Sequence, residues 1–133
     1  MNKKFPCGCG TEKHETIKDK LKNSAYYREN VNKISKIFDL LGEPNRMKIM
    51  LALLEGELCV YHLCEITGGS QSAVSQHLRK LKDERIVKSR REGNLILYSV
   101  ADEHVSLIIK TALEHLKCFS CETGGCEKCP LAD

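Results

Sequence analysis

The chain has 133 residues and a formal net charge of +3, with eight cysteines and no tryptophan. This length suits one domain with a modest core. No apolar run approaches the ~20 residues that span a bilayer, and the basic start lacks the apolar segment of a secretory signal. We therefore expect a cytoplasmic protein without membrane contact. Its cysteines should be reduced, and should bind metal or sense redox state rather than form a disulfide framework.

The N-terminal third predicts an arm followed by helices. Residues 1–14 contain Pro, Gly and Lys without an apolar period, and we expect a flexible arm that carries Cys7 and Cys9. Beyond the arm, apolar residues at helical spacing predict three helices. These helices are expected over residues 16–29, 31–41 and about 45–55.

The segment from Leu58 to Val100 predicts a helix, a glycine turn, a second helix and a β-hairpin, in that order. The turn is Gly68-Gly69, since glycine readily adopts a left-handed backbone, and Ser70 is suited to cap the second helix. Two apolar runs flank the polar stretch Arg90–Asn94, which predicts a hairpin with its tip there. This order is that of a winged helix-turn-helix, which lays its second helix in the DNA major groove. An ordinary polar helix beside a surface hairpin is the alternative.

The second helix and the hairpin are rich in polar and basic side chains that suit base edges and phosphates. The candidate DNA contacts are Ser70, Gln71, Ser72, Ser75, Gln76, His77, Arg79, Lys80, Arg90 and Arg91. Residues 79–91 hold seven Lys or Arg against two acids, a local charge of +5, which leaves −2 for the rest of the chain. Localised positive charge is typical of a phosphate-binding surface. A solvated charged face is the alternative.

The last predicted helix carries candidate metal ligands. Asp102 should cap a helix that runs to about residue 118, with Asp102, His104, His115 and Cys118 near one face. His104 and His115 are separated by ~16 Å along the helix axis, whereas metal–nitrogen bonds are about 2 Å long. One helix therefore cannot gather all four ligands, but two antiparallel copies in a homodimer can, which gives two equivalent sites. Exposed histidines on a dimer helix are the alternative.

Two more candidate ligands, Cys59 and Cys64, lie in the first helix of the motif. On an ideal helix they point about 140° apart, so they do not readily share an ion. Each is equally suited to be a small buried apolar residue. The arm's Cys7 and Cys9 could fold back onto Cys59 and complete a site of three or four thiolates, which would favour thiophilic ions.

The C-terminal tail, residues 120–133, extends the cysteine pattern. Cys118, Cys121, Cys126 and Cys129 form two CxxC pairs, a spacing typical of zinc sites. This pattern is compatible with two interpretations of the tail: an ordered zinc site, or a disordered end that binds metal. The expected organisation is a flexible arm over 1–14, a DNA-binding and dimerisation domain over 15–119, and this tail.

Three of these motifs together resemble the ArsR/SmtB family of metal-sensing bacterial repressors. They are Glu57–Val60, Ser70–Leu78 and the helix with Asp102, His104 and His115, and the resemblance covers roughly residues 31–118. It implies a mainly α-helical, homodimeric winged helix-turn-helix with a small β-hairpin and a recognition helix at about 71–82. It also implies that the metal-free dimer binds double-stranded operator DNA and that metal binding releases it.

The sequence departs from the family pattern at positions that influence which metal ion we expect to act as the effector. Arsenic- and cadmium-sensing members commonly carry ELCVCDLC where this chain has ELCVYHLC, so Tyr61 replaces the middle thiol. This argues against a compact three-thiol site in that helix alone. The Cys7 and Cys9 pair is similar to that of the cadmium- and lead-responsive, CadC-type members, and Cys118 stands where zinc-sensing members have His or Glu. The resemblance implies a CadC-like repressor whose effector is a divalent ion: Cd²⁺, Pb²⁺ or Zn²⁺.

Two other functions are open. The same fold could act as a thiol redox switch whose cysteines form disulfides, or the chain could buffer zinc with its tail and bind no DNA. No nucleophile, base and orienting group stand at a recognisable spacing, so we do not expect an enzyme.

Overall fold

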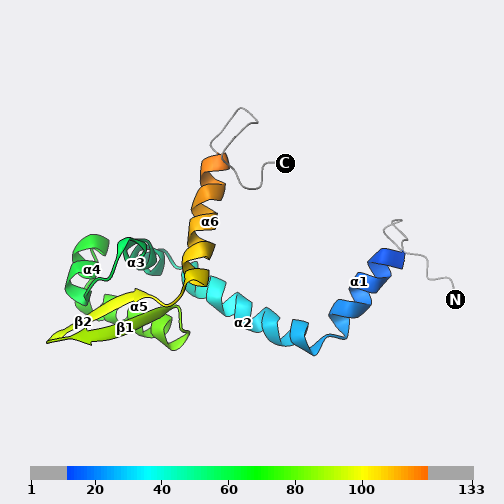
Figure 1. Ribbon diagram of the computed structural model, residues 1–133, viewed down its shortest axis with the longest axis horizontal. Helices are drawn as coiled ribbons and strands as arrows, with labels where there is room; N and C mark the ends of the chain where they lie inside the picture. Colours follow the sequence, from blue (N-terminus) through cyan, green and yellow to red (C-terminus); the bar gives the residue numbers. More distant parts are fainter. Residues whose placement is uncertain (1–11, 120–133) are drawn as a thin grey trace. The chain divides into compact units, whose positions relative to one another are not determined.

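The computed structural model describes residues 12–119, as helices and one β-hairpin (Figure 1). The chain divides into two compact units between Asp39 and Leu40. The first unit holds α1 (Glu12–Lys22) and most of α2 (Ala25–Leu41). The division lies inside the segment 15–119, and α1 begins inside the expected arm. The functional assignment of arm, domain and tail stays a prediction, and the cysteines of residues 1–11 and 120–133 lie outside the described residues.

The break between the first two helices lies at Asn23 and Ser24 rather than near residue 30. The backbone N–H of Asn23 donates to the carbonyl of Asp19 at 3.1 Å, at the end of α1. Ser24 Oγ then accepts from the backbone N–H of Tyr27 at 3.2 Å, as an N-cap side chain does. The expected boundary between these two helices was wrong because apolar residues keep their helical spacing on both sides of Ser24, so their pattern does not reveal the capping serine.

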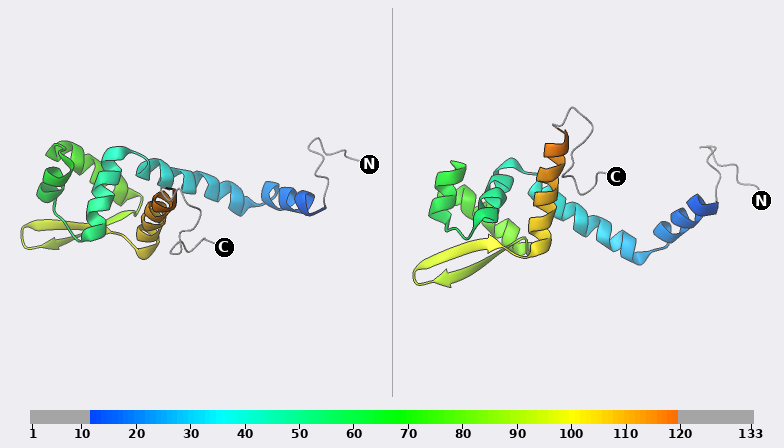
Figure 2. Two further views of the ribbon diagram at one scale, coloured as in Figure 1. Left: turned by 90° about the horizontal axis from the view of Figure 1, so that it is seen from above. Right: turned by 45° about the horizontal axis from the view of Figure 1, so that its top comes forward.

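The second unit is a winged helix-turn-helix, as the sequence predicted. Its elements are α3 (Pro44–Glu55), α4 (Val60–Thr67), α5 (Gln71–Asp83), β1 (Val87–Glu92), β2 (Leu95–Val100) and α6 (Glu103–Phe119). Figures 1 and 2 show α3, α4 and α5 grouped together, with the hairpin running along one side of them.

Side-chain caps fix where three of these helices begin. Glu43 accepts from the backbone N–H of Arg46 at 2.8 Å, and Pro44 occupies the first turn of α3. The expected caps at Ser70 and Asp102 are confirmed. Ser70 Oγ accepts from the backbone N–H of Ala73 at 3.1 Å, and Asp102 Oδ1 accepts from that of Val105 at 3.0 Å. Each cap satisfies a backbone donor that the helix itself leaves unpaired.

The core of the second unit draws apolar side chains from its helices and from the start of the hairpin. Its buried members include Ile49, Met50, Leu53, Leu63, Val74, Leu78, Leu81, Ile86, Val87, Val105 and Ile109. Arg46 is buried among them, and its Nε donates to the carbonyl of Leu40 at 2.8 Å. Because three apolar residues of α5 are locked into this core, the opposite side of α5 must face outward.

The turn between α4 and α5 and the hairpin both form where the sequence predicted them, but the turn of the hairpin is shorter than expected. Gly68 ends α4 with φ +74°, whereas the turn of the hairpin depends on Gly93 with φ +61°. Both values fall in the left-handed region that glycine tolerates best. Arg90 and Arg91 lie within β1, where Arg90 is opposite Leu97, so the expected tip at Arg90–Asn94 was too long.

A third short segment joins the hairpin. Leu58 and Tyr98 form an antiparallel bridge. The backbone N of Leu58 lies 3.1 Å from the carbonyl oxygen of Tyr98 that accepts its hydrogen bond, and the backbone N of Tyr98 lies 2.8 Å from the carbonyl oxygen of Leu58. The residues just before α4 are therefore fastened to β2 through the backbone. Across residues 12–119, no helix has the length and apolar character that crossing a membrane requires.

Candidate DNA-binding surface and metal ligands

The outer face of α5 is a row of exposed polar and basic side chains. Its exposed members are Gln71, Ser72, Ser75, Gln76, Arg79 and Lys80. Ser70 also lies at the surface, but its hydroxyl already accepts the capping hydrogen bond from Ala73. Amides, hydroxyls and cations on one exposed helix face are the groups that read base edges and hold phosphates.

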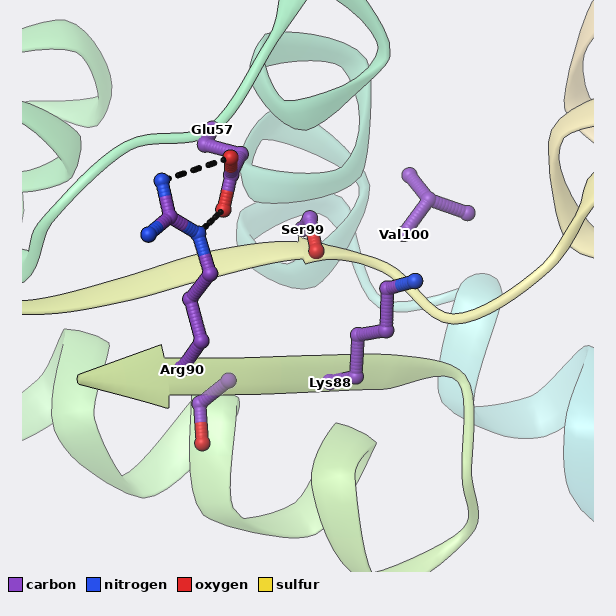
Figure 3. Close-up of a pocket in the computed structure, with 6 residues that line it drawn as sticks. Glu57, Lys88, Arg90, Ser99 and Val100 are labelled. Carbon is purple, nitrogen blue, oxygen red and sulfur yellow. Dashed lines mark hydrogen bonds and ion pairs between the residues drawn. The ribbon is translucent and has the colours of Figure 1, made fainter. Parts of the chain in front are cut away.

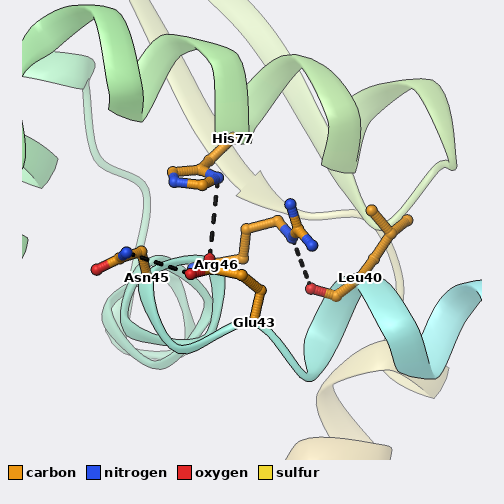
Figure 4. Close-up of polar contacts among 5 residues, drawn as sticks. All are labelled: Leu40, Glu43, Asn45, Arg46 and His77. Carbon is orange, nitrogen blue, oxygen red and sulfur yellow. Dashed lines mark hydrogen bonds and ion pairs between the residues drawn. The ribbon is translucent and has the colours of Figure 1, made fainter.

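His77 does not belong to this outer face, and the expectation that it points outward was wrong. Figure 4 shows its ring directed from α5 toward the start of α3, and its side chain is 21% exposed. Nδ1 lies 4.0 Å from Glu43 Oε2, too far for a hydrogen bond, and this buried nitrogen has no hydrogen-bond partner among the described residues. The reason is position: His77 comes three residues after Val74, on the flank of α5 that packs inward.

Glu43 is the centre of the contacts around His77. Besides capping α3, it accepts from the side-chain amide of Asn45 at 3.2 Å (Figure 4). The hydrogen bond from the backbone of Arg46 lowers the pKa of the Glu43 carboxyl, and the positive charge of Arg46 acts in the same direction. A cavity of about 100 Å³ adjoins this junction and is lined by residues of α3, the end of α4, the glycine turn and α5.

One face of the hairpin is joined to α5 by a hydrogen bond. Lys82, near the end of α5, donates from Nζ to Ser89 Oγ in β1 at 2.7 Å. Successive side chains of a strand point to opposite faces, so Arg91 shares the face of Ser89 and Arg90 does not. Arg91 is exposed and forms no ion pair with residues 12–117. The side of the hairpin next to α5 therefore keeps an uncompensated guanidinium.

Arg90 is instead engaged by carboxylates. Figure 3 shows it reaching to Glu57, which precedes α4, and it also contacts Glu92 at 3.1 Å. The hydrogen bond from Arg90 lowers the pKa of Glu57, and the same bond raises the pKa of Arg90. Together with Lys88, which points to the same side, Glu57 and Arg90 border an open cavity of about 490 Å³ (Figure 3).

The start of α6 brings two of the expected metal ligands together. Asp102 Oδ1 lies 3.6 Å from His104 Nδ1, and the two side chains are 52% and 91% exposed. His115 is exposed near the other end of the same helix. Cys118 belongs to α6, but its side chain is outside the described residues. His104 and His115 both lie on α6, about three turns apart, so one protomer does not bring these two rings to a single ion.

The expected ligands before and within α4 differ in environment. Cys59 is buried and has an extended backbone, because α4 begins only at Val60. The ideal-helix angle between Cys59 and Cys64 therefore does not apply, and Cys64 is half-buried within α4. Within the described part of the chain, no group of three or more His, Cys, Asp or Glu side chains is placed to hold a metal ion.

Sequence reasoning missed two contacts in this region. One is the pairing of Glu57 with Arg90, which no local pattern indicates because 33 residues separate them. The other joins Cys59 to His62, whose Sγ and Nδ1 lie 3.2 Å apart. A signal for the second contact was present, since Cys-x-x-His at a helix start brings the two side chains to the N-cap and third helical positions.

The amino-acid sequence is similar to those of known regulatory proteins. The model of the family described as "bacterial regulatory protein, arsR family" matches residues 43–89. A cadmium resistance transcriptional regulatory protein CadC homolog from Staphylococcus aureus is 42% identical over 89 residues, which are 66% of this chain and 74% of that protein. A transcriptional repressor SmtB homolog from Synechocystis is 38% identical over 89 residues, which are 67% of each chain.

A solved structure extends the likeness to three dimensions. It is the homodimeric winged helix-turn-helix DNA-binding domain of a possible ArsR-family transcriptional regulator from Mycobacterium bovis. The TM-score is 0.63 at 28% identity, with 72% of this chain and 93% of that chain covered.

Proposed function

Because this chain belongs to the arsR family of bacterial regulatory proteins, we propose that it is a metal-responsive transcriptional repressor. It binds double-stranded operator DNA as a metal-free homodimer in the cytoplasm and leaves the DNA when a divalent ion binds. The observation that carries this proposal is the exposed polar face of α5 beside the hairpin face that bears Arg91. A helix with such a face, next to a basic hairpin, suits the major groove and the adjacent phosphates.

The proposed DNA contacts divide by chemistry. Gln71, Ser72, Ser75 and Gln76 face base edges, and the cations of Arg79, Lys80 and Arg91 hold phosphates. Two α5 helices of a homodimer would enter successive major grooves about 34 Å apart. The relatives named as repressors and the homodimeric neighbour support this arrangement.

The proposed effector is Cd²⁺, Pb²⁺ or Zn²⁺. One site consists of Asp102 and His104 of one protomer with His115 and Cys118 of the other, because these carboxylate, imidazole and thiolate groups are ligands for zinc-like ions. The proximity of Asp102 to His104 at the start of α6 supports half of this ligand set. The second site uses the thiolates of Cys7, Cys9 and Cys59, with Cys64 as a further candidate ligand. The cadmium-resistance relative supports an ion of this class.

The test is a titration of operator binding. The reduced, metal-free protein is bound to a labelled fragment of its own promoter region, and the dissociation constant is measured with each ion. An allosteric effector typically weakens binding by roughly 5- to 150-fold, and Mg²⁺ serves as the hard-ion control. Release by peroxide but by none of the three soft or borderline ions would instead identify a redox switch. A protein that binds zinc but no promoter fragment would be a metal-handling protein.

A further inference from the structure

Lys82 and Ser89 form a hydrogen bond between the last turn of α5 and strand β1. The Nζ of Lys82 donates to the Oγ of Ser89 at 2.7 Å. Lys82 belongs to the basic segment 79–91, but its ammonium is engaged by the hairpin. A hydrogen bond from a charged donor is stronger than one between two neutral groups. Lys82 therefore joins two elements of the proposed DNA-binding surface to each other.

Ser89 is the residue at which β1 leaves the body of the second unit. Val87, two residues earlier, is 2% exposed and belongs to the core, whereas Ser89 is half-buried. Residues 90–96, which include the whole turn of the hairpin, are all exposed. A strand rises about 3.4 Å per residue, so Arg91 lies ~7 Å beyond Ser89 on the same face. The position of the Arg91 guanidinium therefore depends on how the hairpin is held at Ser89.

Two other contacts hold the hairpin, but neither of them reaches α5. A backbone bridge fastens Tyr98 of β2 to Leu58, before α4. Arg90 pairs with a carboxylate on the opposite face of the hairpin. The bond from Lys82 joins β1 directly to α5. It therefore acts on the distance between the side chains of α5 that are proposed to face base edges and the guanidinium that is proposed to hold a phosphate.

We propose that Lys82 and Ser89 are positioning residues for DNA binding. Their hydrogen bond holds the hairpin at the angle to α5 at which Arg91 meets a phosphate while the outer face of α5 occupies the major groove. This inference rests on the DNA-binding function proposed above and deepens it. With the bond in place, the hairpin is ordered before DNA arrives, so DNA binding does not bear the entropic cost of ordering it. The bond therefore raises the affinity for DNA although neither residue contacts DNA.

The first test compares two variants of Ser89 in the full chain that have the same branched shape, which suits a strand. Ser89→Thr retains the hydroxyl, whereas Ser89→Val replaces it by a methyl group. Ser89→Val should weaken binding to a labelled promoter fragment by roughly two- to tenfold, the loss expected for one hydrogen bond. Ser89→Thr should bind as the wild type does. Equal affinities of the two variants, measured by fluorescence anisotropy, would overturn the proposal.

Salt dependence and a double mutant distinguish positioning from direct contact. Ser89→Val removes no charge, and the Arg91 contact still forms once the hairpin is ordered, so the slope of log K against log salt concentration should match that of the wild type. In an Arg91→Ala background, Ser89→Val should cause no further loss of affinity, because the guanidinium that the bond positions is gone. Additive losses would overturn the proposal. So would a slope reduced by about one unit in Lys82→Met, because Lys82 would then hold a phosphate itself.

A measurement without DNA separates this inference from the proposed function. The backbone order parameters of residues 90–96, obtained from ¹⁵N relaxation, should be lower in Ser89→Val than in the wild type and in Ser89→Thr. This result in a protein that binds no promoter fragment would refute the proposed function while supporting the ordering of the hairpin by the bond. Unchanged order parameters in a protein whose promoter binding responds to metal ions would support the function and overturn the positioning role.

Discussion

Arg90 forms a two-pronged ion pair with Glu57: its Nε lies 2.7 Å from one carboxylate oxygen and its Nη2 lies 3.1 Å from the other. The pair joins strand β1 to the segment before α4, beside the backbone bridge of Leu58 and Tyr98. Arg90 and Arg91 are neighbours in sequence, yet their charges have different environments. Carboxylates neutralise the first, and the second stands on the hairpin face next to α5.

This difference predicts unequal roles for the two arginines in DNA binding. Arg91→Ala should weaken binding to all DNA sequences similarly and reduce the slope of log K against log salt concentration by about one unit, because one phosphate contact is lost. Arg90→Ala should change the slope less, because its charge is already paired. Fluorescence anisotropy over a salt series measures both slopes. An unchanged slope for Arg91→Ala would show that the hairpin does not contact phosphates.

The adjacent residues Gln76 and His77 should separate base recognition from packing. Gln76 is exposed on the outer face of α5, so Gln76→Ala should alter sequence preference by about 1–3 kcal/mol at one base pair and leave unfolding unchanged. His77→Ala should keep the sequence preference and lower the stability by about 1 kcal/mol, since it removes a ring packed against α3. Binding to a panel of operator variants and urea unfolding provide the two measurements. The reverse pattern would return His77 to the DNA-binding face.

The cap of α3 should make stability dependent on pH in the acidic range. The folded state lowers the pKa of Glu43 below its ordinary 4.5, chiefly through the hydrogen bond from the backbone of Arg46. The unfolded state therefore binds this proton more readily. The stabilisation is present above pH 4.5 and is lost as the pH falls through the lowered pKa.

Two variants of Glu43 isolate this contribution. The difference in unfolding free energy between wild type and Glu43→Gln should be larger at about pH 6.5 than at about pH 3.5, as measured by urea denaturation. Glu43→Asp retains a capping carboxylate and should follow the wild-type pH dependence. A difference that does not vary with pH would contradict the role of the ionised cap.

Gly68 should be sensitive to substitution for a backbone reason alone. Its φ is +74°, and a Cβ placed there would meet no atom within 4 Å. Gly68→Ala should therefore cost about 1 kcal/mol of stability from the left-handed backbone. Gly68→Asn should cost less, because asparagine tolerates this conformation. Thermal unfolding of the two variants compares these costs, and equal stability of Gly68→Ala and wild type would refute the backbone argument.

The proposed site on α6 predicts a specific result for mixed dimers. A heterodimer of one His104→Ala protomer and one His115→Ala protomer should retain one intact site and lose the other, since the two histidines of a site come from different chains. Differently tagged protomers allow the heterodimer to be purified, and the stoichiometry of bound Zn²⁺ gives the number of sites. Two full sites, or none, would show that the ligands are not shared across the dimer.

The sequence by itself determined the winged helix-turn-helix, because the signals for it are local. The glycine at the end of α4, the capping serine before α5 and the apolar runs on either side of the polar hairpin turn depend on neighbours a few residues away. The same holds for the core side of α5, where Val74, Leu78 and Leu81 recur at helical spacing. The resemblance to the family rested on Glu57–Val60, Ser70–Leu78 and the helix with Asp102, His104 and His115, and the comparisons confirmed family membership.

Only the tertiary structure decided which polar side chains remain available on that framework. Exposure of His77 depends on what lies against the flank of α5, and the start of α3 lies there. The charge of Arg90 depends on Glu57, which is distant in sequence and adjacent in space. Helical spacing predicts the direction of a side chain but not the group it meets, because that group is brought in by another element of the fold.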